Sequence, residues 1–233
     1  MLLERAAKLE REMTREALWE GALETFVEIG FPFVAYIMTD DDRRQLDFWA
    51  NISAAYENYN PARDPFLDYC CQSYEAWRIG PECLQDYENM PEEAVAFVKN
   101  AAEIIGCNSG FGIPMRIEGS SRFGGFLLLT SLGREAFEAE FADRFSEING
   151  FCLLVHRRFE ELGALNADAL KTLTRRERDI IARIANGATR KECARELSLS
   201  PHTVAEYTKS AYRKLGVRNR AEAAKVVLSN GGR

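Results

Sequence analysis

The chain has 233 residues, of which 46% are hydrophobic and 28% charged, enough apolar material for one or two globular domains. This composition excludes a disordered or collagen-like chain, and no apolar run approaches the roughly 18 residues that a membrane span needs. Charges run through the first thirty residues, which therefore lack the apolar stretch of a secretory signal. We expect a cytoplasmic protein with no membrane partner.

The net charge of −6 conceals a division of the chain into two parts of opposite sign. Residues 171–233 hold 15 Lys and Arg against 6 Asp and Glu, whereas residues 1–170 hold 15 against 30. Small residues with Gly and Asn lie where the sign changes. We predict an acidic domain over residues 1–162, a linker over 163–171 and a basic domain over 172–233.

The six cysteines show no repeated spacing and fall mostly in apolar or helical patterns, which indicates buried thiols rather than a disulfide framework. His156 and His202 are the only histidines, so the sequence argues against a metal site. Neither histidine is arranged with a Ser or Cys nucleophile, and no Gly-rich phosphate loop occurs. We therefore expect no cofactor and no enzymatic activity.

The acidic domain opens with a helical stretch over residues 2–29 and then segregates strands from helices. Apolar runs rich in β-branched and aromatic residues predict strands at 33–38, 46–52, 112–117 and 124–130. Helical patterns lie at 66–76, 91–105 and 134–162. This order predicts an α+β fold, an α/β/α sandwich with an antiparallel sheet, and such a sandwich can hold an internal ligand cavity.

The middle of this domain combines many aromatic side chains with an acidic residue, Asp64, placed before Pro65. The aromatic residues are Trp49, Tyr56, Tyr59, Phe66, Tyr69, Tyr74 and Trp77. An apolar pocket for an amphipathic small molecule has this composition. Asp before Pro is equally typical of a turn or helix N-cap, and the aromatic residues are equally typical of a plain core.

The pattern over residues 134–162 places apolar residues at near-helical spacing: Phe137, Phe141, Phe145, Ile148, Cys152 and Val155. It predicts a helix whose apolar surface is either shared with a second subunit or packed in an ordinary core.

The basic domain shows four helix starts at short range. Thr174 with Glu177 and Thr189 with Glu192 fit the capping box, Ser200 precedes a proline, and Asn219 with Glu222 has a similar layout. Gly187 and Gly216 supply stops. We predict an all-α domain of four short helices.

Residues 197–200 leave room only for a tight turn between the second and third helices, which is the geometry of a helix-turn-helix. The third helix would enter the major groove of double-stranded DNA with His202, Thr203, Ala205, Glu206, Lys209 and Arg213. A second set near helix ends would contact phosphates: Arg190, Lys191, Lys214 and Arg218. Lys209 could donate to guanine and Glu206 could accept from a cytosine amine. The alternative for any one of these residues is a solvated, charged helix surface.

Several segments of the basic domain resemble the DNA-binding domain of LuxR-type regulators. They are residues 173–177, 184–187, Glu192, Ala194, Leu197, Ser200, Thr203, Val204, residues 214–217, Asn219 and Arg220. Tyr207 departs from the pattern, since many members carry histidine there. The resemblance implies a bacterial transcription regulator. It identifies DNA binding as the activity of this domain but not the signal that controls it.

The acidic domain resembles the autoinducer-binding domain of the same family. The matching residues, in order, are Tyr56, Asp64 to Phe66, Trp77, Ser109 and Gly110, Ile113 and Pro114, and residues 123–131. The resemblance implies an N-acyl-homoserine lactone signal. Asp64 would accept a hydrogen bond from the amide NH of the lactone, and Tyr56 would donate a hydrogen bond to its acyl carbonyl. Trp77 would pack on its lactone ring, with Phe66, Gly110, Thr130 and Ser131 also at the site.

One family position departs from the pattern. A tryptophan that donates to the lactone carbonyl is replaced here by Ile52, and the spacing from Tyr56 to Asp64 is one residue short. Either a neighbour such as Trp49 replaces that donor, or the ligand is not an ordinary acyl-homoserine lactone.

The resemblance implies a quorum-sensing transcription activator that binds its signal and, as a homodimer, a two-fold promoter site, with RNA polymerase as a further partner. The alternative is an orphan or antagonist whose acidic domain forms heterodimers with a related regulator and binds no lactone.

Overall fold

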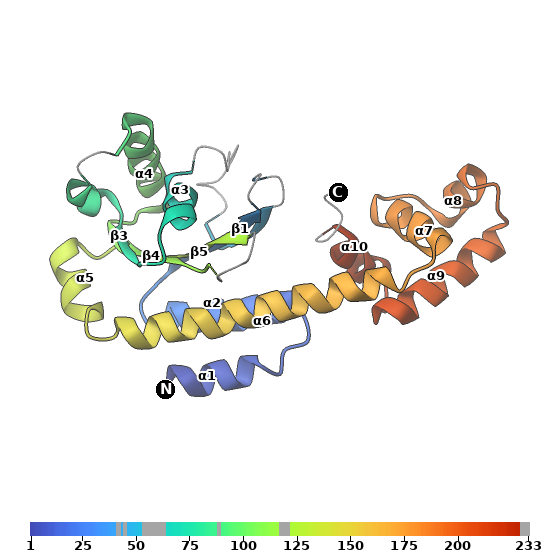
Figure 1. Ribbon diagram of the computed structural model, residues 1–233, viewed down its shortest axis with the longest axis horizontal. Helices are drawn as coiled ribbons and strands as arrows, with labels where there is room; N and C mark the ends of the chain where they lie inside the picture. The colour runs from blue at the N-terminus through green and yellow to red at the C-terminus, as the bar shows by residue number, and fades with distance from the viewer. Residues whose placement is uncertain (41–42, 44–45, 53–63, 88–89, 117–121, 229–233) are drawn as a thin grey trace. The chain divides into compact units, whose positions relative to one another are not determined.

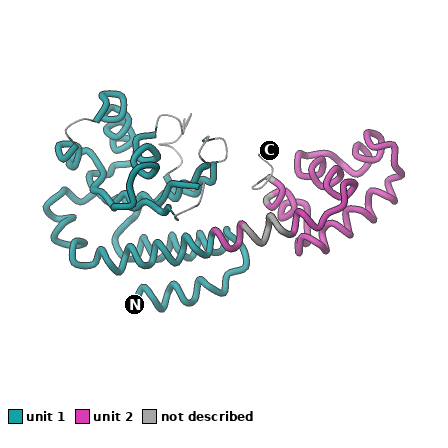
Figure 2. The backbone as a smooth tube through the Cα atoms, in the orientation of Figure 1, with its two compact units in different colours: residues 1–159 teal, residues 160–233 magenta. Residues whose placement is uncertain are grey.

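The computed structural model describes residues 1–40, 43, 46–52, 64–87, 90–116 and 122–228. The chain divides into two compact units, residues 1–159 (unit 1) and residues 160–233 (unit 2), which are coloured separately in Figure 2. No helix in the described ranges is long and apolar enough to cross a membrane.

Unit 1 is built on a five-stranded antiparallel sheet in the order β2-β1-β5-β4-β3. The strands are β1 (Phe33–Asp40), β2 (Leu46–Ala50), β3 (Trp77–Ile79), β4 (Ser109–Pro114) and β5 (Arg122–Thr130). The central strands β1, β5 and β4 are almost wholly buried, because helices cover both faces of the sheet (Figure 1). The predicted α/β/α sandwich with an antiparallel sheet is confirmed.

Strand alternation assigns each side chain to one of the two faces. Ala35, Ile37, Leu127 and Leu129 point toward α3 (Pro65–Gln72) and α4 (Glu92–Ile105), and we call this the α3/α4 face. Tyr36 and its neighbours on the opposite face pack against α2 (Arg15–Glu28), α5 (Arg134–Phe141) and α6 (Phe145–Lys171).

The structure corrects the prediction of one helical stretch over residues 2–29. The chain instead forms α1 (Leu2–Leu9) and α2, because the side chain of Thr14 caps α2 by accepting a hydrogen bond from the backbone NH of Ala17 at 3.2 Å.

The predicted helix over residues 134–162 is likewise two helices, α5 and α6, separated at residues 142–144. On either side of the break a phenylalanine packs against another ring. Phe141 packs on Phe31, which precedes β1, at 4.5 Å between ring centroids, and Phe145 packs on Phe111 of β4 at 4.9 Å.

Two short elements were not predicted. Strand β3 has three residues, too few for an alternating pattern to show, and the 3-10 helix η3 (Pro81–Asp86) follows it. The segment 163–171, which we predicted as a linker, has helical backbone as the end of α6.

Unit 2 contains the four predicted short helices. They are α7 (Arg175–Ala185), α8 (Arg190–Glu196), α9 (Pro201–Leu215) and α10 (Arg220–Leu228). Both capping boxes form, and Ser200 caps α9 by accepting from the NH of Thr203. Gly216 ends α9 in the left-handed conformation, at φ 69°.

Candidate functional site

Helices α8 and α9 form a helix-turn-helix. Residues 197–200 connect them, and Ser198 adopts a left-handed φ of 54° in this turn. The NH of Leu199 donates to the carbonyl of Ala194 at 2.9 Å, which ties the turn back to α8.

A small apolar core fixes the angle between these helices and α7. Its buried members are Ile180, Ile184, Cys193, Ala194 and Val204, with Tyr207 partly buried against them. Because α9 buries Val204, Thr208, Ala211 and Leu215 at steps of four, three and four, its opposite side is presented to solvent.

That solvent-facing side of α9 carries His202, Glu206, Lys209 and Arg213, all exposed, and we call it the α9 face. It extends about 16 Å along the helix, at 1.5 Å per residue. Thr203 and Ala205 are half-exposed beside it. A helix of this kind can place three or four side chains against base edges in the major groove.

The second predicted set separates into two groups. Arg190, Lys191 and Arg218 are exposed near helix ends, where they are free to meet phosphates. Lys214 is half-buried, and its Nζ donates to Glu177 Oε2 at 2.6 Å. Its charge is therefore neutralised within unit 2.

Glu177 is the acceptor at the centre of that contact and is 3% exposed. Its carboxylate also accepts from Ser210 Oγ at 2.7 Å and from the NH of Thr174 at 2.7 Å. Burial raises the pKa of Glu177, but hydrogen bonds from Lys214, Ser210 and Thr174 outweigh burial and lower it to about 2. Glu177 thus joins the start of α7 to α9 as a charged group.

In unit 1 the α3/α4 face brings together Phe66 and Trp77, and Asp64 lies at the start of α3; all three are at least nine-tenths buried. Ile52 lies in the same cluster, and Gly110 lies on the same face between Ile79 and Leu129. Asp64 caps α3, since its Oδ1 accepts from the NH of Phe66 at 2.8 Å. The N-cap interpretation of Asp64 is therefore confirmed.

Trp77 is enclosed by two tyrosines. Tyr69 stacks on it at 4.5 Å with an interplanar angle of 12°, and Tyr87 meets it edge-on at 5.1 Å. The Nε1 edge of the indole lies against Gly112, where an added Cβ would fall 2.0 Å from Trp77 Nε1. Among the described residues, Trp77 Nε1 has no hydrogen-bond acceptor, and the buried Thr39 hydroxyl on the same face also has no partner.

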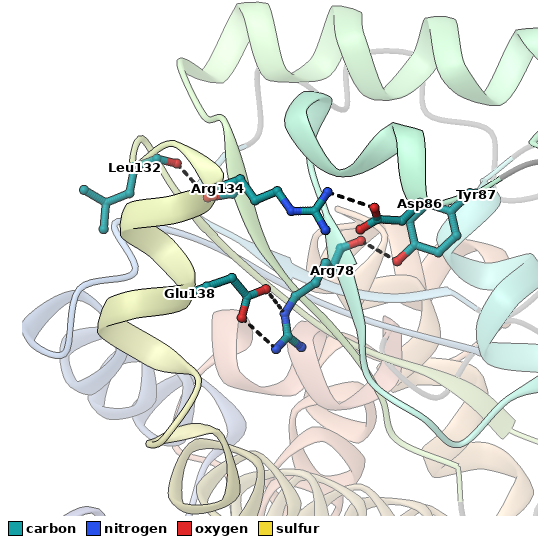
Figure 3. Close-up of polar contacts among 7 residues, drawn as sticks. Arg78, Asp86, Tyr87, Leu132, Arg134 and Glu138 are labelled. Carbon is teal, nitrogen blue, oxygen red and sulfur yellow. Dashed lines mark hydrogen bonds and ion pairs between the residues drawn. The ribbon is translucent and has the colours of Figure 1, made fainter.

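Contacts of Arg78 and its neighbours hold the strand that carries Trp77 (Figure 3). Arg78 forms a bidentate pair with Glu138 of α5 at 2.6 and 3.0 Å and lies over the Phe111 ring at 4.7 Å. Its carbonyl accepts from the hydroxyl of Tyr87 at 2.8 Å. Arg134 adds a contact to Asp86 at 2.8 Å, so β3, η3 and α5 are tied together.

The other predicted ligand residues lie elsewhere. Trp49 points to the opposite face, where its Nε1 donates to Asp47 Oδ1 at 2.8 Å. Thr130 also alternates to that face, and its hydroxyl accepts from the NH of Leu132. Ser131 is exposed beyond the end of β5. Tyr56 lies outside the described residues.

Two open depressions lie on the surface of unit 1 beside η3, with volumes of about 650 and 350 Å³. Pro81 borders both, and neither is lined by Asp64, Phe66 or Trp77. Within the described part of the chain, no group of three or more His, Cys, Asp or Glu side chains is placed to hold a metal ion.

Comparison with known proteins places the basic unit in a family. Residues 171–227 match the family described as "Bacterial regulatory proteins, luxR family". The chain is 41% identical over 71 residues to "Probable transcriptional regulatory protein SgaR" of Hyphomicrobium methylovorum, covering 30% of this chain and 34% of SgaR. The match thus spans about a third of that relative.

The match to a shorter protein is more complete. Spore germination protein GerE of Bacillus subtilis is 39% identical over 59 residues, which is 25% of this chain and 80% of GerE. The structure of SdiA in complex with octanoyl-rac-glycerol is 18% identical, with a TM-score of 0.49 over 99% of this chain and 94% of SdiA. A structure of Escherichia coli SdiA is 19% identical, with a TM-score of 0.45 over 97% and 94%. From the helix-turn-helix of unit 2 and its match to GerE, the chain belongs to the luxR family of bacterial regulatory proteins.

Proposed function

We propose that this protein is a ligand-responsive transcription regulator that binds double-stranded DNA through the α9 face. The observation that carries the proposal is that His202, Lys209 and Arg213 are exposed on one side of a helix whose other side is fixed in the unit 2 core. Arg190, Lys191 and Arg218 supply the sequence-independent phosphate contacts.

The DNA-binding part is tested by selecting fragments from a randomised duplex pool with the full chain, alone and with acyl-homoserine lactones, and titrating salt. We expect one enriched motif with two-fold symmetry and an affinity that falls as salt rises. Equal affinity for all duplexes at every salt concentration would contradict the proposal.

For unit 1 we propose an amphipathic signal, an N-acyl-homoserine lactone or a similar molecule, held on the α3/α4 face. Two observations support a ligand there. Buried polar atoms of Trp77 and Thr39 lack partners within the described residues, and a desolvated donor or acceptor without a partner costs about 1 to 3 kcal/mol. A ligand that carries an acceptor and a donor would remove that cost.

We assign the ligand amide to Asp64 and the polar head group to Trp77. Ile52, with no donor of its own, lies in the same cluster. Trp49 and Thr130, on the opposite face, and the exposed Ser131 are not included in this pocket. The assignment retains Phe66 and Gly110 as its apolar lining and Tyr56 as a donor, in the position that the family pattern gives it.

The substitution Asp64→Asn tests this assignment. Asn is as good an N-cap as Asp, so α3 should keep its cap while the charge that would hold the ligand amide is lost. We expect the thermal midpoint without ligand to stay within about 2 °C of wild type, and the upward shift with an acyl-homoserine lactone to disappear. An unchanged ligand-induced shift would reject the role of Asp64.

We further propose that the regulator acts as a homodimer, because one helix-turn-helix reads only a half-site. On α6, Leu153 is 50% exposed, which gives a second copy an apolar contact. RNA polymerase is the expected partner of an activator on the promoter.

The alternative is a regulator whose unit 1 forms heterodimers without a ligand. One observation favours it: Tyr69 stacks on Trp77 and occupies a ring face that a lactone would need. A ligand that binds must displace Tyr69 or use another edge of the indole. The variant Tyr69→Ala distinguishes the two alternatives: a thermal shift with lactones that the variant shows and wild type lacks would mean that Tyr69 closes the core of wild type.

A further inference from the structure

Glu206 is a carboxylate in the middle of a face that is otherwise suited to a polyanion. His202 lies four residues before it, Lys209 three residues after it and Arg213 seven residues after it, all exposed on the same side of α9. Glu206 is itself exposed and makes no hydrogen bond or ion pair with the described residues.

The other glutamates of α7 to α10 each have a structural role. Glu177, Glu192 and Glu222 accept hydrogen bonds at the starts of helices, and Glu196 pairs with Arg183 at 3.0 Å. Glu206 is the sixth residue of α9, beyond the first turn where a negative charge is stabilised by the helix dipole. Unit 2 therefore gives Glu206 no structural reason to be acidic.

A carboxylate in the major groove can accept hydrogen bonds but cannot donate them. The bases present only two kinds of donor there, the amino groups of cytosine N4 and adenine N6. At adenine the N7 acceptor lies beside N6 and repels a carboxylate, so cytosine is the base that suits Glu206. Against guanine or thymine, Glu206 would face acceptors and nearby phosphates and would weaken binding. The cost of Glu206 therefore depends on the DNA sequence, whereas a contact from Arg190 or Arg218 to phosphate does not.

We propose that Glu206 is a specificity-determining residue that rejects half-sites without a cytosine at one position, while Lys209 reads a guanine close by. This inference rests on the proposed DNA-binding function. Three residues of helix rise about 4.5 Å and one base-pair step rises about 3.4 Å, so the cytosine and guanine lie one or two steps apart. Glu206 supplies selectivity more than affinity.

The experiment selects duplexes from a randomised pool with the wild-type full chain, Glu206→Ala and Glu206→Gln, and then measures Kd for the selected and for unrelated duplexes. With Glu206→Ala we expect discrimination at the cytosine position to fall by about tenfold to a hundredfold. We also expect affinity for unrelated DNA to rise a few-fold, because one repulsive charge has been removed. With Glu206→Gln the preferred base should change from cytosine to adenine, whose N6 and N7 pair with an amide.

Glu196→Gln is the matched control, because it removes the same charge from an exposed glutamate that lies on α8 outside the α9 face. It should leave the selected sequence unchanged. The inference is overturned if both Glu206 variants select the wild-type sequence with wild-type discrimination, or if Glu206→Ala weakens all duplexes equally. A wild-type chain that selects no sequence, either alone or with acyl-homoserine lactones, would instead overturn the proposed DNA-binding function.

Discussion

At the scale of single residues, Glu177 connects the start of α7 to α9 through one buried carboxylate. It accepts from the backbone of Thr174 and from the side chains of Ser210 and Lys214. The capping half of this arrangement was predictable, because Thr174 and Glu177 are three residues apart. The pairing with Lys214 was not, since it joins residues 37 apart that only the folded helices bring together.

Replacing Glu177 with Gln should destabilise unit 2 by about 1 to 3 kcal/mol at neutral pH, because hydrogen bonds to a charge are replaced by weaker ones. The folded pKa of about 2 lies below the ordinary 4.5. The stability that the carboxylate contributes is therefore complete above about pH 4.5 and is lost as the pH falls toward 2. Urea unfolding followed by circular dichroism at pH 7 and pH 3 measures both effects, and Glu177→Gln should lose less stability between these values than wild type. A variant as stable as wild type at pH 7 would contradict the role.

His156 in unit 1 is a buried group that is neutral in the folded state, whereas Glu177 is charged. It is buried, its Nδ1 lies 2.9 Å from the hydroxyl of Tyr36, and its Nε2 has no partner among the described residues. Burial lowers the pKa of His156 to about 4, with a smaller contribution from the charge of Arg122. The folded state therefore holds this histidine neutral at pH values where the unfolded chain binds a proton.

At the scale of elements, the α9 face and the residues at helix ends should have different effects on DNA binding. Lys209→Ala should relax base preference at one position by about tenfold, since it removes a base contact. Arg190→Ala should weaken binding to all sequences alike and reduce the salt slope by about 1. Fluorescence-anisotropy titrations of the full chain at several salt concentrations measure both. If the two variants lost affinity uniformly, the orientation of α9 in the groove would be wrong.

The elements of unit 2 were the most predictable part of the fold, because caps, stops and turns are local and α7 to α10 follow them closely. Unit 1 was less predictable. The break between α1 and α2 depends on the cap at Thr14. The break between α5 and α6 depends on the contacts of Phe141 with Phe31 and of Phe145 with Phe111, which are distant in the sequence.

The fold brings together only part of the predicted site, because the position of each residue depends on contacts that are distant in the sequence. Phe66 and Trp77 meet on the α3/α4 face, with Asp64 at the start of α3, whereas strand pairing turns Trp49 and Thr130 to the other side of the sheet. A residue's face depends on strand register, and register is set by partners far away in the sequence. The stack of Tyr69 on Trp77 joins α3 to β3 and likewise had no local signal.

At the scale of the whole molecule, the two units should respond to acid in different pH windows. The folded pKa of His156 is below the ordinary 6.5. The stability that unit 1 has with this histidine buried and neutral is therefore complete above about pH 6.5 and is lost as the pH falls toward 4. Between pH 7 and pH 5 the loss is about 2 kcal/mol. Unit 2 should keep the contribution of Glu177 over that range.

The three tryptophans, Trp19, Trp49 and Trp77, all lie in unit 1, so tryptophan fluorescence follows its unfolding alone. We expect the urea midpoint by fluorescence to fall between pH 7 and pH 5 in wild type and to stay nearly constant in His156→Gln. His202→Gln, a change of the exposed histidine on α9, is the control and should behave as wild type. A fall of equal size in His156→Gln would assign the pH dependence to other groups.

The most direct test of the central claim is native mass spectrometry of the full chain purified from cells grown with and without a panel of acyl-homoserine lactones. It records bound mass and oligomeric state in one spectrum. A ligand-responsive regulator predicts a retained small molecule and a dimer that forms only with it. A soluble chain that stays empty with every lactone, with the same oligomeric state throughout, would contradict a lactone sensor and favour the heterodimer alternative.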